Sequence, residues 1–159
     1  MIGGFHHRGA LATVCAVAEP VVSGYLFRLN TELRRRLQQE LANEPLLAES
    51  GVRVPCVAML RMIDVRGPVS QREIAEALLV DPSDLVSVLD VLEDAGFLER
   101  RRDPDDRRRN AVVLTPAGKA ATDRAMDLAV RVEEATLARL TEAQRAQLGR
   151  LIETAIGDA

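Results

Sequence analysis

The sequence predicts a mainly α-helical fold with one small β-hairpin. Three observations predict it. Apolar residues recur every three or four positions along most of the chain, two short central segments each begin with a helix-capping signal, and a later stretch alternates around an arginine-rich turn. At 159 residues the chain is long enough for one domain with a core and too short for two independent ones. We therefore expect an extension over residues 1–20 and a single domain over residues 21–159.

The first half of that domain is expected to supply two helices around one loop. The apolar run within residues 1–20 is short and weakly hydrophobic, which favours an extension over a secretory signal. Apolar residues at helical spacing predict a long helix over residues 21–41. A loop is expected over residues 42–51 and a helix over residues 54–66, which has Cys56, Met59, Leu60 and Ile63 facing inward.

A short helix is predicted over residues 70–78 because Ser70 and Glu73 form a capping box, in which each side chain binds the other's backbone N–H. Its solvent side leaves Gln71 and Arg72 free to meet a partner. The apolar side is expected to hold Ile74, Ala75, Leu78 and Leu79.

A second short helix is predicted from Pro82 to Ala95. Asp81 can cap its start, proline suits the first helical position, and Gly96 supplies the left-handed residue that ends it. Two short capped helices joined by a tight turn match the helix-turn-helix pattern. The solvent face is expected to carry Ser83, Asp84, Ser87 and Asp90.

A hairpin is predicted next, with strands over residues 97–102 and 110–115 around the turn-forming run DPDDRRR. Guanidinium groups suit phosphate and a narrow minor groove because they are planar, charged and able to donate parallel hydrogen bonds. A solvated, salt-bridged hairpin is the alternative for a charge run, and the preceding helix-turn-helix favours contact with nucleic acid. The hairpin's arginines are Arg100, Arg101, Arg102, Arg107, Arg108 and Arg109.

The chain ends in two further predicted helices. Thr115 and Pro116 cap and start a helix that runs to about Arg139, and Thr141 with Gln144 forms a capping box for the last one. A helix of that first length spans about 35 Å at about 1.5 Å per residue, more than the small central module covers. The economical partner for its apolar stripe is a second copy, and a two-fold dimer would read an inverted repeat whose halves lie about 34 Å apart.

Composition narrows the function further. A net charge of −3 disfavours a protein that binds nucleic acid non-specifically along its length. Aromatic residues make up only 3% of the chain, which disfavours recognition of single strands by base stacking. Binding to duplex DNA is the remaining interpretation. The two cysteines are too few for a disulfide framework, which fits a protein of the reducing cytoplasm. Neither they nor the two adjacent histidines suffice for a metal site. No nucleophile–histidine pairing or glycine-rich phosphate loop points to an enzyme or to a cofactor.

The run from Ser70 to Ala120 resembles the MarR family of bacterial ligand-responsive transcriptional regulators. The segments SQREIAEAL, VLDVLEDAGFLER, DPDDRR and VVLTPAG follow one another in the family's order and spacing, and the flanking long helices extend the likeness from about Val21 to the C-terminus. The resemblance implies a homodimer held by helices over residues 21–44 and 116–159. It also implies a winged helix-turn-helix over residues 54–115.

By the same resemblance, the second short helix enters the major groove and the wing reaches the minor groove, where Asp106 braces the wing and Arg108 enters. The expected DNA-binding residues are Ser70, Gln71, Arg72, Ser83, Asp84, Ser87, Arg100, Arg102, Asp106, Arg107, Arg108 and Arg109. A small aromatic or phenolic ligand is expected to release the DNA. Its predicted contacts are Tyr25, Leu29, Met59 and Met62, although methionine at helical spacing is also typical of core packing.

The predicted recognition helix departs from the family pattern because it carries carboxylates and no basic residue. Acidic side chains can accept from the amino group of cytosine, yet they repel phosphates. Base readout is then sparse, and affinity depends on Arg72, the helix N-termini and the wing. The same departure keeps an alternative open, namely a winged-helix interaction module that no longer binds DNA.

Overall fold

The computed structural model describes residues 21–102 and 110–157, so the N-terminal extension lies outside it. The chain divides into two compact units between Glu32 and Leu33, within helix α2 (Val22–Asn43). The first unit is represented by the first half of α2, where Val22, Tyr25 and Phe27 are exposed.

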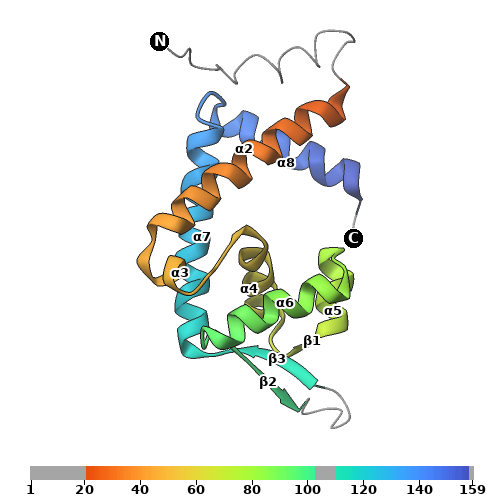
Figure 1. The fold of residues 1–159 in the computed structure, drawn as a ribbon. Helices are drawn as coiled ribbons and strands as arrows, with labels where there is room; N and C mark the ends of the chain where they lie inside the picture. Colours follow the sequence, from red (N-terminus) through yellow and green to blue (C-terminus); the bar gives the residue numbers. More distant parts are fainter. Residues whose placement is uncertain (1–20, 103–109, 158–159) are drawn as a thin grey trace, which may run out of the picture. The chain divides into compact units, whose positions relative to one another are not determined.

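The second unit contains the remaining elements and is mainly helical, with one small sheet (Figure 1). In chain order these are α3 (Pro45–Glu49), α4 (Val54–Arg66), β1 (Val69–Ser70), α5 (Gln71–Leu78), α6 (Pro82–Asp94), β2 (Leu98–Arg102), β3 (Asn110–Leu114), α7 (Pro116–Thr136) and α8 (Glu142–Ile156).

Helix α4 supplies the centre of the core. It contacts α5, α6, α7 and strand β3, so it touches both the helix-turn-helix and the long helix that follows the hairpin. The inward-facing residues predicted for this helix are confirmed, and two more are buried with them. Its buried residues are Cys56, Val57, Met59, Leu60, Met62 and Ile63.

The sheet has three antiparallel strands in the order β1-β3-β2. The predicted hairpin is confirmed as β2 and β3, which pair Leu98 with Leu114 and Arg102 with Asn110. Strand β1 was not predicted. It pairs Val69 with Val112 just before α5 begins, which attaches the start of the helix-turn-helix to the hairpin.

Hydrogen bonds from Thr115 join the end of α6 and the start of β2 to the start of α7. Thr115 caps α7 by accepting from the Gly118 backbone N–H at 3.0 Å, and its hydroxyl donates to the Gly96 carbonyl at 2.7 Å. The Thr115 backbone N–H also donates to the Phe97 carbonyl at 3.0 Å. A Cβ on Gly118 would lie 1.7 Å from that same carbonyl oxygen, so only glycine fits there.

Three sequence expectations are wrong in this unit. The predicted loop over residues 42–51 contains α3, which begins at Pro45 and buries Leu47 completely. Leu79, expected on the buried side of α5, is the C-cap at φ 51° and is 92% exposed, because the left-handed turn directs it to solvent. Periodicity along α7 predicts an apolar stripe of Ala117, Ala121, Ala125, Leu128, Val132 and Ala135. Of these, Ala117 and Ala135 are exposed, while Gly118 and Thr122 are buried.

Candidate nucleic-acid interface

The helix-turn-helix is built from the capping signals that its sequence contains. Ser70 and Glu73 form the capping box of α5, and Asp81 accepts from the Ser83 backbone N–H at 2.8 Å to cap α6. Hydrogen bonds from the Ser83 hydroxyl and backbone N–H lower the pKa of Asp81. The turn between the helices is residues 79–81, so both helices have defined ends close together.

Helix α6 presents a polar face to solvent. Leu85, Leu89 and Leu92 are buried on its other side and set its orientation on the core. The exposed face is short of donors because the hydroxyl of Ser83 donates to Asp81 and that of Ser87 reaches the Ser83 carbonyl at 3.4 Å. The predicted face residues Ser83, Asp84, Ser87 and Asp90 are all exposed.

Three predicted DNA contacts lie at the start of α5, and they differ in how far they are exposed to solvent. Ser70 is buried and serves as the cap, and Gln71 is half-buried. Arg72 is 83% exposed and pairs through Nε with Glu76 at 2.7 Å, one turn along the same helix. Of the three, Arg72 is therefore the residue best placed to reach a partner.

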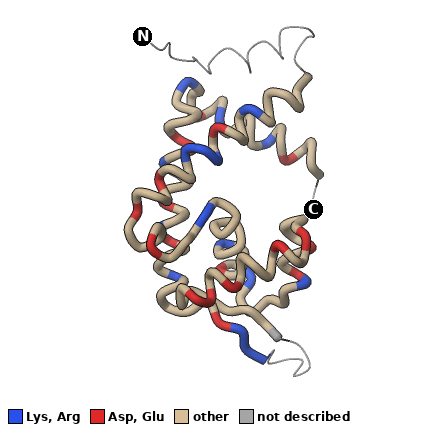
Figure 2. Tube along the Cα trace, in the orientation of Figure 1, with Lys and Arg blue, Asp and Glu red and all other residues tan. Residues whose placement is uncertain are grey.

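Strand β2 brings the basic residues out from the core. Side chains alternate along a strand, so Leu98, Arg100 and Arg102 share one face, while Glu99 and Arg101 share the other and pair with each other. Figure 2 shows basic residues along β2 and acidic residues along the neighbouring α6. Arg102 has no ion pair with any residue of the described ranges.

Arg100 differs from the other arginines of β2. Its side chain is only 25% exposed and pairs with two carboxylates of α6: Nη2 lies 2.6 Å from Asp90 Oδ1, and Nη1 contacts Glu93 Oε2. Its backbone N–H also donates to Glu93 Oε1 at 3.3 Å. The sequence predicted both the arginine and the acids without indicating that they meet.

The tip of the hairpin lies outside the described residues. The predicted contacts Asp106, Arg107, Arg108 and Arg109 belong to it. Their roles stay predictions from the sequence.

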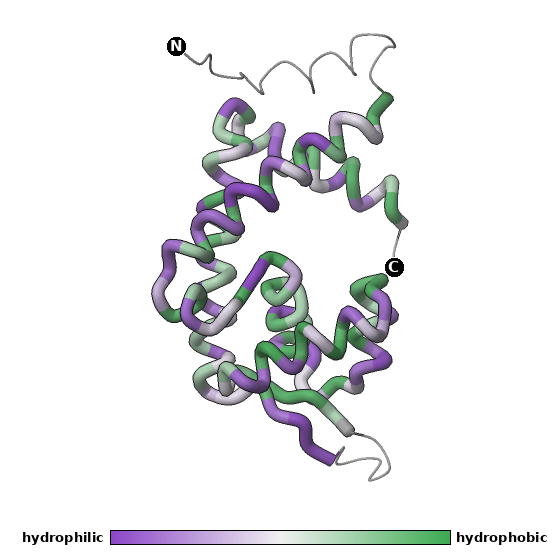
Figure 3. Tube along the Cα trace, viewed as in Figure 1, coloured by the Kyte–Doolittle hydropathy of each residue, from purple (hydrophilic) through white to green (hydrophobic). Residues whose placement is uncertain are grey.

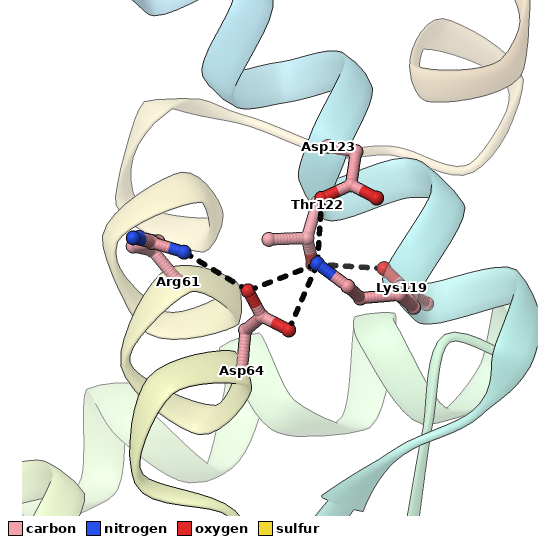
Figure 4. Close-up of polar contacts among 6 residues, drawn as sticks. Arg61, Asp64, Lys119, Thr122 and Asp123 are labelled. Atoms are coloured by element: carbon pink, nitrogen blue, oxygen red, sulfur yellow. Dashed lines mark hydrogen bonds and ion pairs between the residues drawn. The ribbon is translucent and has the colours of Figure 1, made fainter.

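A second ion-pair cluster joins α4 to α7 (Figure 4). The Lys119 ammonium lies between Asp123, at 2.7 Å, and Asp64, at 3.2 Å, and Asp64 also accepts from Arg61 at 3.0 Å. Asp123 and then Asp64 raise the pKa of Lys119, so it stays protonated. The cluster links α4, which packs against the helix-turn-helix, to the long helix α7. The sequence pattern did not indicate these ion pairs.

Among the hollows lined by described residues of the second unit, two lie against α7. One of about 380 Å³ lies among α4, β3 and α7 beside Asp64 and Lys119. The other, of about 430 Å³, lies between the second half of α2 and α7 and is lined by Arg35, Arg36 and Arg131.

The predicted ligand contacts line neither hollow. Met59 and Met62 are buried within the core, which is the packing role that was the alternative for them. Tyr25 and Leu29 belong to the first unit. The ligand assignment therefore stays a prediction.

Three other features of the described residues bear on function: potential metal ligands, the Cys56 thiol, and the length and apolar content of the helices. Within them, no group of three or more His, Cys, Asp or Glu side chains is placed to hold a metal ion. Burial raises the pKa of the Cys56 thiol, which keeps it protonated at neutral pH. None of the helices in residues 21–102 and 110–157 combines the length and the apolar content that a membrane span requires.

Comparison with known proteins decides the family. The MarR family matches residues 55–109, from the start of α4 into the segment after β2. The HTH-type transcriptional repressor Rv2887 of Mycobacterium tuberculosis is 31% identical over 138 residues, which cover 86% of this chain and 95% of that protein. This chain belongs to the MarR family. Its resemblance to the family in sequence is thereby confirmed, and it is a winged helix-turn-helix transcriptional regulator, not an enzyme.

Two further relatives support this MarR-family assignment. The crystal structure of the same Mycobacterium tuberculosis protein in complex with DNA aligns with a TM-score of 0.68 at 28% identity, over 87% of this chain and 98% of that one. A putative transcriptional regulatory protein for the hcr operon of Thauera aromatica is 35% identical over 103 residues, 65% of this chain. The chain spans 62% of that relative's length.

Proposed function

We propose that this MarR-family regulator is a homodimeric repressor that binds an inverted-repeat operator in duplex DNA. The observation that carries the proposal is the arrangement of the second unit. Helix α6 is capped, oriented by three buried leucines and exposed on its polar face, and the arginine-bearing strand β2 leads away from beside it. The relative whose structure was determined with DNA and which is named a repressor has the same fold.

Helix α6 is the recognition helix of this proposal, and it enters the major groove. Its exposed residues can contribute serine hydroxyls and the Asp84 carboxylate, which can accept from the amino group of cytosine. No arginine, lysine, asparagine or glutamine lies on α6, so the bidentate contacts that identify guanine and adenine are missing from it. Sequence readout is therefore narrow, and phosphate contacts provide most of the affinity.

Those phosphate contacts come from Arg72 on α5, Arg102 on β2 and the wing tip, of which Arg108 enters the minor groove. Each phosphate that is neutralised adds about 0.9 to the slope of log affinity against log salt. Strong salt dependence follows. A nearly flat salt titration would contradict this distribution of contacts.

The dimer is proposed to form through the helices at the two ends of the chain. Leu151 and Ile156 on α8 are 60% and 73% exposed in the single chain, and Tyr25 and Phe27 on α2 are also exposed. A second copy is the economical cover for such surfaces and gives the two-fold symmetry that an inverted repeat requires. Residues 21–44 and 116–159 are thus the proposed dimerisation helices, residues 54–115 the DNA-binding module.

Release of the DNA by a small aromatic or phenolic ligand is the remaining part of the proposal. Its support is the family membership, and Tyr25, Leu29, Met59 and Met62 are its proposed contacts. A screen of aromatic carboxylates and phenols for release of a bound duplex tests it.

The decisive experiment is binding of the purified protein to a fluorescent duplex of its own upstream intergenic sequence at two salt concentrations. Arg108→Ala should abolish salt-sensitive binding, and Arg139→Ala, which removes the same charge from the exposed segment between α7 and α8, should not. If the parent protein does not bind at low salt, the DNA-binding proposal is wrong. The interaction-module alternative would then be favoured.

A further inference from the structure

We infer that Arg100 is a positioning residue: it fixes the wing to the recognition helix and offsets part of the negative charge of that helix by pairing with Asp90 and Glu93, rather than contacting DNA itself. The inference rests on the proposed DNA-binding function and deepens it. It assigns to Arg100 a different role from those of Arg102 and the arginines of the wing tip.

The recognition helix presents an electrostatic problem. Helix α6 carries Asp84, Asp90, Glu93 and Asp94 and no basic residue. Duplex DNA carries one negative charge for about every 1.7 Å of its length, so each uncompensated carboxylate near it opposes binding. A helix with this composition needs a cation from elsewhere in the fold to approach a groove closely.

The geometry around Arg100 supplies that cation. Asp90 and Glu93 are three residues apart and so lie on one side of the helix. The fork of the guanidinium reaches both, with Nη2 at 2.6 Å from Asp90 Oδ1 and Nη1 on Glu93 Oε2. One arginine therefore serves two carboxylates through separate nitrogens, which a lysine ammonium matches poorly.

The backbone adds a third connection. The Arg100 N–H donates to Glu93 Oε1 at 3.3 Å, so Glu93 is bound by both the main chain and the side chain of one residue. This sets the position of β2 along α6 as well as the charge. The Arg100 side chain is 25% exposed and that of Glu93 is 36% exposed, so salt screens this pair less than it screens a fully exposed pair.

The strand register explains why Arg100, and not its neighbours, has this role. Arg100 follows the buried Leu98 on the same face of β2, and it pairs across the sheet with Val112, which is completely buried. Its aliphatic stem therefore leaves the core directly beneath α6. Arg101 lies on the opposite face, and Arg102 is one further step toward the tip and exposed.

The consequence concerns both parts of the DNA-binding surface. The wing emerges from α6 at a fixed place, so the recognition helix and the hairpin are presented together. Arg100 offsets one of the three negative charges in the C-terminal half of α6 and holds two of its carboxylates in ion pairs, and Asp84 at the N-terminal end stays available for base readout.

A double-mutant cycle separates this role from a phosphate contact. Arg100→Ala is made in the parent protein and in an Asp90→Asn/Glu93→Gln background, and binding to the duplex is measured for all four proteins. Loss of the cation that offsets two acids should weaken binding at least about tenfold in the parent. In the neutral background the same substitution should change affinity by no more than about twofold, the usual error of additivity.

The matched control is Arg102→Ala in the same two backgrounds. Arg102 is an arginine on the same face of the same strand, and as a phosphate contact it should lose equal affinity in both. If Arg100→Ala behaves in this way too, with equal losses in the two backgrounds, the positioning role is wrong. If the alanine variant does not fold, the cycle is repeated with Arg100→Lys, which keeps one positive charge without the fork that reaches both carboxylates and should therefore lose affinity in the parent but not in the neutral background.

A measurement without DNA keeps this result distinct from failure of the proposed function. Urea unfolding of the same proteins should show that Arg100→Ala lowers the unfolding midpoint in the parent and changes it less in the neutral background. Equal shifts would exclude the connection between β2 and α6 whether or not the protein binds DNA. A clear coupling combined with no DNA binding would refute the proposed function and retain the ion-pair connection alone.

Discussion

Helices α7 and α8 begin with the same kind of local signal and end in different surroundings. Each starts at a threonine cap, Thr115 or Thr141, and each carries hydrophobic and hydrophilic residues interspersed along its length (Figure 3). Six residues of α7 are buried, whereas no residue of α8 is. Capping and periodicity thus specify that a helix forms, and the rest of the fold decides what covers it.

The largest effect should come from Gly118→Ala at the start of α7. A methyl group there would lie 1.7 Å from the Phe97 carbonyl oxygen, and neither backbone can move without breaking the Thr115 cap. We expect the free energy of unfolding to fall by about 3 kcal/mol or more. Chemical denaturation measures it, with Gly149→Ala on α8 as the control, since no atom lies within 4 Å of a Cβ there. Similar losses at the two glycines would contradict this difference between the helices.

The next largest difference in unfolding free energy is expected between leucine-to-alanine substitutions on α7 and on α8. Leu128 on α7 is 2% exposed, so Leu128→Ala should cost about 3 kcal/mol at any protein concentration. Leu151 on α8 is 60% exposed in the single chain. The cost of Leu151→Ala should therefore be small in dilute protein and increase with concentration if a second copy covers α8. Urea unfolding at two concentrations tests both, and no dependence on concentration for Leu151→Ala would count against the proposed dimer.

Removing the threonine cap should also destabilise the protein more at α7 than at α8, by a smaller amount than the leucine substitution on α7. Thr115→Ala removes the cap of α7 and the bond to the Gly96 carbonyl, which should cost about 1–2 kcal/mol of global stability. Thr141→Ala removes a cap from a helix with no buried residue. Hydrogen exchange in dilute protein should show faster exchange within α8 and little global change. A global loss equal to that of Thr115→Ala would show that α8 is integral to the cooperative unit.

The smallest change in stability is expected at Leu79, the C-cap of α5, where apolar periodicity predicted burial and the side chain is exposed. Leu79 has φ 51° and is almost fully exposed, so its side chain gains little from burial and its backbone is strained. Leu79→Gly should stabilise the protein by up to about 1 kcal/mol, less the entropy that glycine adds to the unfolded chain. Thermal unfolding measures it. A clear loss of stability would mean that Leu79 makes contacts absent from the single chain.

Much of the fold could be predicted from signals within a few residues of one another. The capping boxes at Ser70 and Thr141, the cap at Asp81 and the change to alternation after Gly96 all correspond to observed element ends. What could not be predicted depends on distant residues. Strand β1 is two residues long and exists only because β3 lies beside it.

The same division applies to the candidate site. The exposure of Ser83, Asp84 and Ser87 follows from the apolar stripe on the other side of α6, so the sequence predicted it correctly. The contact of Gly118 with Phe97 had one available signal, because glycine in the first turn of a helix usually has a packing reason. The partners of Arg100 had none, because they depend on the register of β2 against α6.

The ion pairs of Arg100 constrain which sequences can replace this one. A substitution at position 100 alone leaves two carboxylates uncompensated, and a substitution at Asp90 or Glu93 alone leaves part of the guanidinium without a partner. Among homologous regulators the three positions should therefore change together: an acidic pair should accompany arginine, and uncharged residues should appear at both helix positions where the strand has lost it.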